Sequence, residues 1–247
     1  MPSVQVVKDA PSLARVAAAQ FVDRAAAAIA ARGRFAVALS GGSTPRAMYT
    51  LLASDGLVHR VDWAHVHLFF GDERCVPPEH PDSNYRMVRE TLLAHAPVPP
   101  GNVHRMRGED APAEAALAYE ADLRAFFGSG TAPRFDLVLL GMGDNGHTAS
   151  LFPGQPAVRE RVRWVVACYV DEVGMWRLTL TPVAINAAAE VTFLVAGAGK
   201  AAMLKRVLEG PYQPDLLPAQ IVRPTDGVLR WLVDEAAAAD LARVPSP

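Results

Sequence analysis

Residues 35–45, Phe-Ala-Val-Ala-Leu-Ser-Gly-Gly-Ser-Thr-Pro, predict a strand, a tight turn and the start of a helix in direct succession. The run 35–39 is apolar throughout, which is typical of a strand buried on both faces of a sheet. Two glycines then allow a tight turn, Ser43 or Thr44 is expected to cap the helix, and Pro45 suits its first turn. A buried strand that leads straight into a helix is the repeating unit of an α/β fold.

The same alternation continues along the chain. Four further short apolar runs predict strands, at His65–Phe70, Phe135–Leu140, Trp164–Val170 and Val191–Val195. Helical patterns occupy Leu13–Ile29, Arg46–Leu52, Asn84–His95, Glu114–Phe127 and Lys200–Glu209, and Gly33 is expected to end the first of them. We therefore expect an α/β fold, a mostly parallel sheet with helices on both faces. No repeat or linker interrupts the pattern, which favours a single domain over residues 1–247.

Composition and charge are those of an ordinary globular protein. Of the 247 residues 51% are apolar, and the net charge of -2 gives no reason to expect nucleic acid or an anionic membrane as a partner. No apolar run approaches the ~18 residues of a transmembrane helix, and no signal peptide is visible. The two cysteines, Cys75 and Cys168, show no metal-ligand spacing. We expect a cytoplasmic monomer or small homo-oligomer that needs no metal.

Three polar loops follow the first three predicted strands, and ligands of open α/β sheets collect at the carboxyl ends of the strands. The first loop, Gly41, Gly42, Ser43 and Thr44, would present free backbone N–H groups at a helix N-terminus, which is a natural phosphate site. It lacks the Gly-Lys pair of a Walker loop. It also has Ala38 where a nucleophile elbow needs its first glycine. A plain strand-to-helix turn is the alternative.

The second loop is Gly71-Asp72-Glu73-Arg74, directly after the strand that ends at Phe70. Three consecutive charges are costly to bury at a strand end without a purpose. Their expected position beside the phosphate loop favours a site over a solvated loop. Further on, the Asp-Ser-Asn-Tyr segment of residues 82–85 is expected to cap the next helix.

The third loop, Gly141–Thr148, matches the glycine pattern of a dinucleotide-binding turn, with Asp171 near the end of the next strand. Against nicotinamide binding, the helix that should follow is broken early by Pro153 and Pro156. We prefer a glycine-rich turn that holds His147 at the edge of the sheet. Histidine, with an ordinary pKa of about 6.5, suits proton transfer at neutral pH.

Two cations complete the predicted site. Arg177 opens the segment Arg-Leu-Thr-Leu-Thr, and Lys200 follows Gly-Ala-Gly at a junction of strand and helix. A lysine at a helix start opposes the helix dipole, so an anionic ligand would explain its placement. Arg177 could grip a phosphate with two hydrogen bonds, and Lys200 could act as a point charge.

Together these segments resemble the 6-phosphogluconolactonase family, a branch of a larger group that includes the glucosamine-6-phosphate deaminases. The similar segments, in the family's order, are LSGGSTP (39–45), FGDER (70–74), SNY (83–85), GHTASLFPG (146–154) and RLTLT (177–181). GHTASLFPG is the most specific of them. The residues after its histidine favour the lactonase branch over the deaminases.

The resemblance implies a modified Rossmann fold of the deaminase/ribose-isomerase/CoA-transferase type and hydrolysis of 6-phospho-D-glucono-1,5-lactone in the oxidative pentose phosphate pathway, with no cofactor. It implies that His147 is the general acid/base. The candidate catalytic residues are His147, Asp72 and Asn145. The candidate substrate-binding residues are Gly41, Gly42, Ser43, Thr44, Arg74, Arg177 and Lys200.

One position departs from the family's pattern. The family often has Asp directly before Gly-His, where this chain has Asn145, with Asp144 one position earlier. An amide cannot serve as a carboxylate partner of the histidine. Three alternatives stay open: Asp144 compensates, orientation by the amide suffices, or the pKa of His147 is raised less than usual.

Two rival functions also stay open. A deaminase or isomerase would use the same site for chemistry at C1–C2 of an amino sugar phosphate. A non-catalytic phosphosugar-binding protein would keep the phosphate residues and have no use for His147, and the intact loop around His147 argues against this reading.

Overall fold

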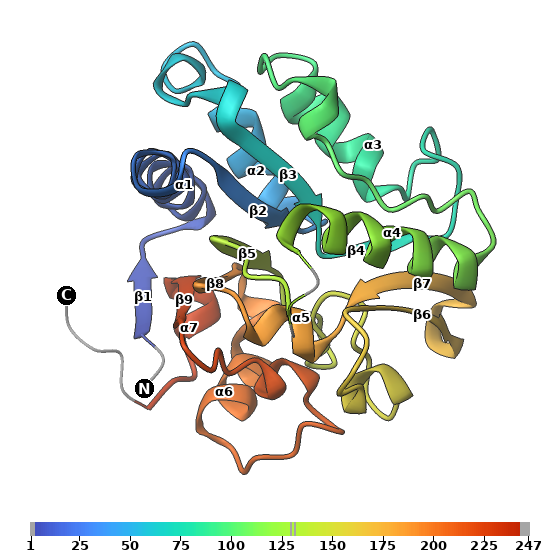
Figure 1. The fold of residues 1–247 in the computed structure, drawn as a ribbon. Helices are drawn as coiled ribbons and strands as arrows, with labels where there is room; N and C mark the ends of the chain where they lie inside the picture. The colour runs from blue at the N-terminus through green and yellow to red at the C-terminus, as the bar shows by residue number, and fades with distance from the viewer. Residues whose placement is uncertain (1–2, 129, 131, 243–247) are drawn as a thin grey trace.

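In the part of the chain that the computed structural model describes, residues 3–128, 130 and 132–242, six strands form one sheet (Figure 1). The predicted domain of residues 1–247 includes nine residues outside this part: 1–2, 129, 131 and 243–247. The sheet order is β1-β9-β8-β5-β2-β3, and every neighbouring pair is parallel. The strands are β1 (Ser3–Val7), β2 (Phe35–Leu39), β3 (Val66–Phe70), β5 (Leu137–Leu140), β8 (Glu190–Val195) and β9 (Val228–Asp234).

Four of these strands were predicted, and two were not. Strands β2, β5 and β8 are buried along their whole length; β2 and β5 are continuous apolar runs, and β8 is apolar except for Glu190 and Thr192. Strand β1 lies at the edge of the sheet and includes the polar Gln5. Strand β9 includes Arg230, whose side chain pairs with Glu190 of β8. A search for unbroken apolar runs therefore misses both.

A second, antiparallel sheet has the order β4-β7-β6. Its strands are β4 (Asp72–Arg74), β6 (Val165–Val170) and β7 (Met175–Leu180). The prediction that Trp164–Val170 is a strand buried on both faces is wrong about its environment: β6 has one wetter face, with Tyr169 exposed. The prediction that Asp72–Arg74 is a loop is also wrong, because β4 pairs with β7.

Helices cover both faces of the large sheet, as predicted (Figure 1). They are α1 (Ala10–Arg32), α2 (Ser43–Leu52), α3 (Asn84–Val88), α4 (Pro112–Phe127), α5 (Pro182–Asn186), α6 (Ala201–Glu209) and α7 (Glu235–Ala238). Helix α1 packs against β2 and β9 on one face, where Phe21 meets Phe35 edge to face. On the other face Trp231 stacks on Phe193, and Trp231 lines a surface hollow together with Val207 of α6.

Of the three helix ends for which the sequence predicts a cap, two are confirmed. Gly33 ends α1 in the left-handed conformation, and the side chain of Ser83 caps α3, both as predicted. A π-helical turn, Arg89–Leu93, continues α3. The prediction that Ser43 or Thr44 caps α2 is wrong, because Gly42 is the cap and no side chain bonds to the first turn. This end of α2 is left open.

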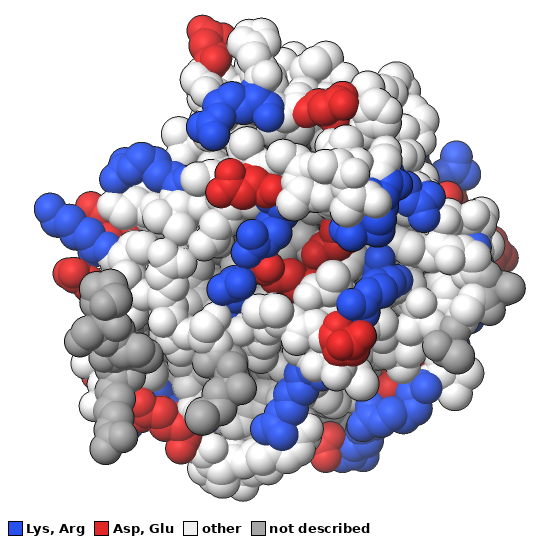
Figure 2. Space-filling view, turned by 60° about the vertical axis from the view of Figure 1, so that its left-hand side comes forward, with Lys and Arg blue, Asp and Glu red and all other residues white. Residues whose placement is uncertain are grey.

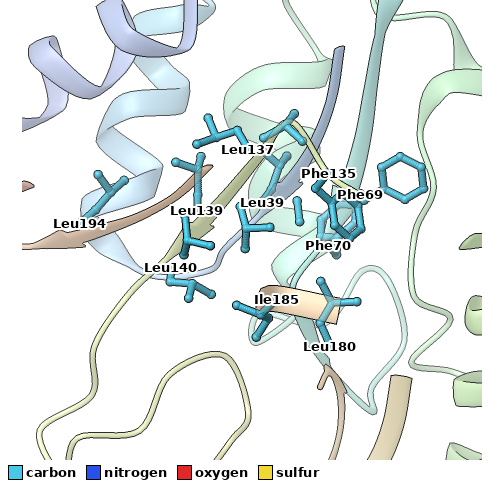
Figure 3. Packing of buried hydrophobic residues seen from close by; sticks show 14 of the residues in the cluster. Leu39, Phe69, Phe70, Phe135, Leu137, Leu139, Leu140, Leu180, Ile185 and Leu194 are labelled. Carbon is cyan, nitrogen blue, oxygen red and sulfur yellow. The ribbon is translucent and has the colours of Figure 1, made fainter. Parts of the chain in front are cut away.

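The core joins the two sheets. Figure 3 shows Leu180, the last residue of β7, and Ile185 of α5 beside Leu140 of the large sheet. All three side chains are fully buried. Short 3-10 turns lie at Val58–Arg60, Trp63–His65, Pro100–Asn102, Pro156–Arg159, Asp171–Val173 (η6), Ala198–Lys200 (η7) and Pro218–Ile221. Within residues 3–128, 130 and 132–242, none of the helices combines the length and the apolar character that crossing a membrane requires.

Candidate active site

The loops after β2, β5 and β8, together with β4 and β7 of the small sheet, border a cleft of about 380 Å³. All seven predicted substrate-binding residues line it, and so do His147 and Asp72. Asn145 does not line it and instead contacts His147 from behind. The parallel sheet explains this convergence, because the carboxyl ends of its strands open at one edge.

The glycine-rich loop fits tightly around His147. The backbone N–H of Gly143 donates to the carbonyl of His147 at 2.9 Å, and Gly146 takes a positive φ of 79°. A Cβ on Gly143 would lie 2.1 Å from the imidazole ring, so only glycine fits there. On its other side the ring stacks on Phe152, with ring centroids 4.0 Å apart. These contacts give the imidazole one orientation.

Asn145 determines which nitrogen of His147 carries the proton. The Asn145 Oδ1 lies 2.6 Å from His147 Nδ1, and the Asn145 Nδ2 donates to the carboxylate of Glu172 at 2.8 Å. A carboxylate only accepts, so the amide N–H₂ must face Glu172 and the amide oxygen must face the ring. His147 Nδ1–H therefore donates a hydrogen bond to Asn145 Oδ1, and the lone pair of the neutral ring is on Nε2.

The structure answers part of the question that the sequence left open. Asp144 does not replace a carboxylate partner of the histidine, because its side chain forms an ion pair with Lys200. The amide of Asn145 contacts the ring. The backbone N–H of His147 also donates to Asn145 Oδ1, at 3.1 Å, which strengthens the orientation.

The surroundings of His147 favour the neutral form of its imidazole ring. Burial lowers its pKa, because an imidazolium is poorly solvated in the wall of the cleft. The charges of Asp72 and Glu172 oppose this shift, and those of Lys200 and Arg177 act in the same direction as burial. The ring is therefore an unprotonated base at neutral pH.

Asp72 is a buried carboxylate in the cleft wall. Ser150 Oγ donates to its Oδ2 at 2.8 Å, and Asn84 Nδ2 donates to its Oδ1 at 3.1 Å. Asn84 also closes against the first loop, since a Cβ on Gly41 would lie 2.0 Å from Asn84 Oδ1. Asn84 thus contacts both the charged segment after β3 and the glycine turn after β2.

The N-terminus of α2 opens toward the same space. Gly42 has a φ of 105°, which favours glycine, and its carbonyl accepts the N–H of Arg46 as the first helical bond. The first N–H groups of a helix have no partner inside the helix. With no side-chain cap on this turn, those of Ser43 and Thr44 are available to an anion.

Two arginines lie side by side on the small sheet. Arg74 of β4 and Arg177 of β7 are paired in register. Burial, and then the nearby charge of Arg74, lower the pKa of Arg177, although a guanidinium stays charged in any protein. Among the described residues, four buried side-chain atoms have no hydrogen-bond partner, and three of them line the cleft: Ser40 Oγ, Arg74 Nε and Arg177 Nε. Buried polar atoms normally have hydrogen-bond partners, so these three mark the wall of the cleft as a polar environment of unusual character.

Sequence reasoning missed several residues of the site. Ser150 and Phe152 lie within GHTASLFPG but gave no signal of a contact to Asp72 or His147. Nothing in the sequence pointed to Glu172, which lies in η6, the turn between β6 and β7. Glu73 lies in the charged segment that was favoured as part of the site, but it turns away and accepts the backbone N–H groups of Asn84 and Tyr85 at the start of α3.

The dinucleotide alternative is contradicted by the same loop. Residues 141–181, all of which the structure describes, contain 3-10 turns and strands but no α-helix. A dinucleotide site needs a helix N-terminus directly after the glycines. In residues 3–128, 130 and 132–242 there is also no group of three or more His, Cys, Asp or Glu side chains placed to hold a metal ion.

Comparison with known proteins gives a consistent result. The family model described as glucosamine-6-phosphate isomerases/6-phosphogluconolactonase matches residues 8–231. Proteins named 6-phosphogluconolactonase from a Nostoc and a Synechocystis species are 41% and 42% identical, each over 97% of this chain and 98% of their own length.

Solved structures agree in fold. The 6-phosphogluconolactonase of Trypanosoma brucei is 30% identical and superimposes with a TM-score of 0.86, covering 98% of this chain and 99% of its own. A monomeric glucosamine-6-phosphate deaminase of the NagB superfamily, 22% identical, superimposes with a TM-score of 0.80 over 96% of this chain and 99% of its own, which supports the predicted modified Rossmann fold. The chain belongs to the glucosamine-6-phosphate isomerase/6-phosphogluconolactonase family.

Proposed function

We propose that this chain hydrolyses 6-phospho-D-glucono-1,5-lactone to 6-phosphogluconate, a step of the oxidative pentose phosphate pathway. Its relatives are named 6-phosphogluconolactonase, which places the activity among the carboxylic ester hydrolases. One observation supports the mechanism above all: a neutral His147, with its Nε2 lone pair free, stands in a cleft that also holds an open helix N-terminus and three cations.

The phosphate end of the substrate would bind between α2 and the cations. The N–H groups of Ser43 and Thr44 suit phosphate oxygens. Arg177, which lines the cleft, would add hydrogen bonds from its guanidinium. Lys200 forms an ion pair with Asp144. On substrate binding its ammonium group would leave Asp144 and pair with the phosphate. Anchoring the phosphate positions the lactone ring and supplies the entropic part of catalysis.

His147 would act first as a base. Its Nε2 takes a proton from a water molecule while the water oxygen attacks the lactone carbonyl carbon, and the carbonyl electron pair moves onto oxygen. The resulting imidazolium then gives its proton to the ring oxygen as the C–O bond breaks, which yields the open hydroxy acid. General acid/base assistance of this kind is worth ~10² to 10⁴-fold in rate.

Asp72 would stabilise the imidazolium that forms between these two steps. Its negative charge is the largest influence that raises the pKa of His147. Because Ser150 and Asn84 occupy one lone pair on each of its oxygens, the carboxylate has a defined place in the wall. Asp72 thus acts on charge in the site, and the proton transfers belong to His147.

The test is the decay of freshly prepared 6-phosphogluconolactone in the presence of the protein, compared with its spontaneous hydrolysis. We expect rapid decay that falls by at least about 100-fold in His147→Ala. A His95→Ala variant, which removes an exposed histidine, should retain the full rate. Decay no faster than buffer would overturn the lactonase proposal. Ammonia release from glucosamine 6-phosphate, measured on the same preparation, would then support the deaminase alternative.

A further inference from the structure

A hydrogen bond beside the cleft connects the loop of His147 with the turn between β6 and β7 of the small sheet. Asn145 and His147 follow β5 of the large sheet, whereas Glu172 belongs to η6, the turn between β6 and β7. The Asn145 Nδ2 donates to Glu172 Oε2 at 2.8 Å, although 27 residues separate them. The Glu172 side chain lines the cleft and is exposed to solvent.

The two hydrogen bonds of Asn145 form one chain. Glu172 accepts from the amide nitrogen, and the amide oxygen accepts from His147 Nδ1 at 2.6 Å. If the amide turned over, its N–H₂ would face a protonated ring nitrogen and its oxygen would face a carboxylate, so both bonds would be lost. The carboxylate of Glu172 therefore selects the amide orientation, and the amide selects the tautomer of the histidine.

We propose that Glu172 is a positioning residue for His147, acting through the side-chain amide of Asn145. This inference rests on the proposed role of His147 as acid and base. Among the described residues, Glu172 reaches the imidazole of His147 through Asn145 and forms no direct hydrogen bond with the ring. Its part is to keep the Nε2 lone pair directed into the cleft, and to place a negative charge behind the imidazolium that forms during the reaction.

Other charged groups also act on the His147 ring, and their influence on its pKa must be distinguished from that of Glu172. Asp72 of β4 and Glu172 of η6 favour the imidazolium, whereas Arg177 of β7 and Lys200 of η7 disfavour it. Only Glu172 is connected to the ring by an unbroken series of hydrogen bonds through a side-chain amide. Variants at Glu172 therefore alter one negative charge and leave the other three charges in place.

The first experiment uses the free protein and needs no substrate. The pKa and the tautomer of His147 are followed by nitrogen-15 NMR in the wild type, Glu172→Ala and Glu172→Gln. We expect the His147 pKa to fall in both variants, because a charge that favours the imidazolium is lost. We also expect the Nδ1–H tautomer to lose population only in Glu172→Ala, since the glutamine oxygen still accepts from Asn145.

The matched control is Asp171→Asn, which removes the adjacent exposed charge from the same turn. It should leave both the pKa and the tautomer of His147 as they are in the wild type. An equal pKa shift in Asp171→Asn, or an unchanged tautomer in Glu172→Ala, would overturn the inference. These readings do not depend on lactone hydrolysis, so they distinguish failure of this inference from failure of the proposed function.

A double-mutant cycle at Asn145 and Glu172, with kcat and KM as the measured quantities, completes the test. Asn145→Asp would place two carboxylates at a hydrogen-bonding distance, and their repulsion should push the side chain of residue 145 off the histidine. We expect kcat to fall on the order of tenfold in this variant, with KM nearly unchanged, because a positioning residue does not bind the substrate. In Asn145→Asp combined with Glu172→Gln the repulsion is absent, and much of kcat should return. Additive losses in the double variant would show that the two residues act independently and would refute the inference.

Discussion

A histidine works as a base only if it is neutral and its free lone pair points at the reacting water. In this protein His147 meets both conditions mostly through contacts with residues that are close to it in the sequence. Gly143 touches one side of the ring, Phe152 stacks on the other, and Asn145 holds Nδ1. Any side chain added against the ring should therefore affect the reaction before it affects the fold.

Replacing Gly143 by alanine tests that fit. The new Cβ would lie 2.1 Å from the imidazole, so the ring must move or tilt away from Phe152. We expect kcat to fall by about 100-fold, the scale of losing a correctly placed acid/base, while the protein stays folded. The measurement is lactone decay alongside the far-ultraviolet spectrum. A matched control is Gly101→Ala, at a position that does not line the cleft and where nothing lies within 4 Å of the added methyl group, and activity should persist. Full activity in Gly143→Ala would mean that the ring does not need this orientation.

The pH dependence of the reaction follows from the burial of His147. Burial lowers its pKa from the ordinary value of about 6.5, so the ring gives up its proton at a lower pH than an exposed histidine does. The base form then predominates at neutrality, and kcat/KM should decline only as the pH falls below about 6.5. Initial rates between about pH 5 and pH 8, corrected for spontaneous hydrolysis, measure this limb. A decline that begins above pH 7 would contradict the assignment of His147 as the base.

Among the elements, α3 depends on a side chain that the charged segment supplies. Buried Glu73 accepts the N–H groups of Asn84 and Tyr85, each at 2.7 Å, and Ser83 caps the same turn. Burial raises the pKa of Glu73, and the backbone donors oppose that shift. The three charged residues of β4 therefore have different surroundings. Asp72 and Arg74 line the cleft, whereas Glu73 forms hydrogen bonds with the start of α3, the helix that includes Asn84.

Glu73→Ala should destabilise the protein by about 2–3 kcal/mol, because buried N–H donors lose their acceptor. Urea unfolding followed by tryptophan fluorescence measures the change. Glu73→Gln keeps one oxygen as an acceptor and should lose less. A change under about 1 kcal/mol in Glu73→Ala would show that water or another group replaces the carboxylate.

Across the molecule, the cleft exists because two sheets meet. Leu180 and Ile185 bring the end of the small sheet and α5 against Leu140 of the large one (Figure 3). The face shown in Figure 2 carries Lys and Arg interspersed with Asp and Glu around a hollow. With a net charge of -2, attraction of an anionic substrate depends on the cations in the cleft itself.

We propose that residues 1–247 form one domain whose sheets unfold together. Leu180 is fully buried where the sheets join, so Leu180→Ala should lower the stability by about 2–5 kcal/mol and shift one cooperative transition in calorimetry. Leu117→Ala on α4, where the side chain is 69% exposed, is the control and should change the stability by less than about 0.5 kcal/mol. Two separate transitions would show that the sheets belong to different domains. A monomeric or small oligomeric state and a cytoplasmic location stay predictions.

Although it did not predict the short helices α5 and α7, the sequence by itself determined the family, the α/β class, four of the six strands of the large sheet and the positions of five of the seven α-helices in the described residues. These depend on local signals: unbroken apolar runs, helical spacing, and end residues such as Gly33 and Ser83. The loop of His147 belongs with them, because its glycines and its histidine are neighbours in sequence. The roles of the site residues are proposals and stay so until activity is measured.

Only the tertiary structure decided the rest. Segments 27 residues apart place Glu172 behind Asn145, and segments 78 residues apart place Ser150 against Asp72. The antiparallel partner of Asp72–Arg74 is β7, which turned an expected loop into a strand and set Arg74 beside Arg177. Hydrogen bonds between distant segments leave no periodic or compositional trace in a single sequence, because each partner alone looks like an ordinary surface residue. They form where the chain brings two sheets together, and that meeting is a property of the packed core.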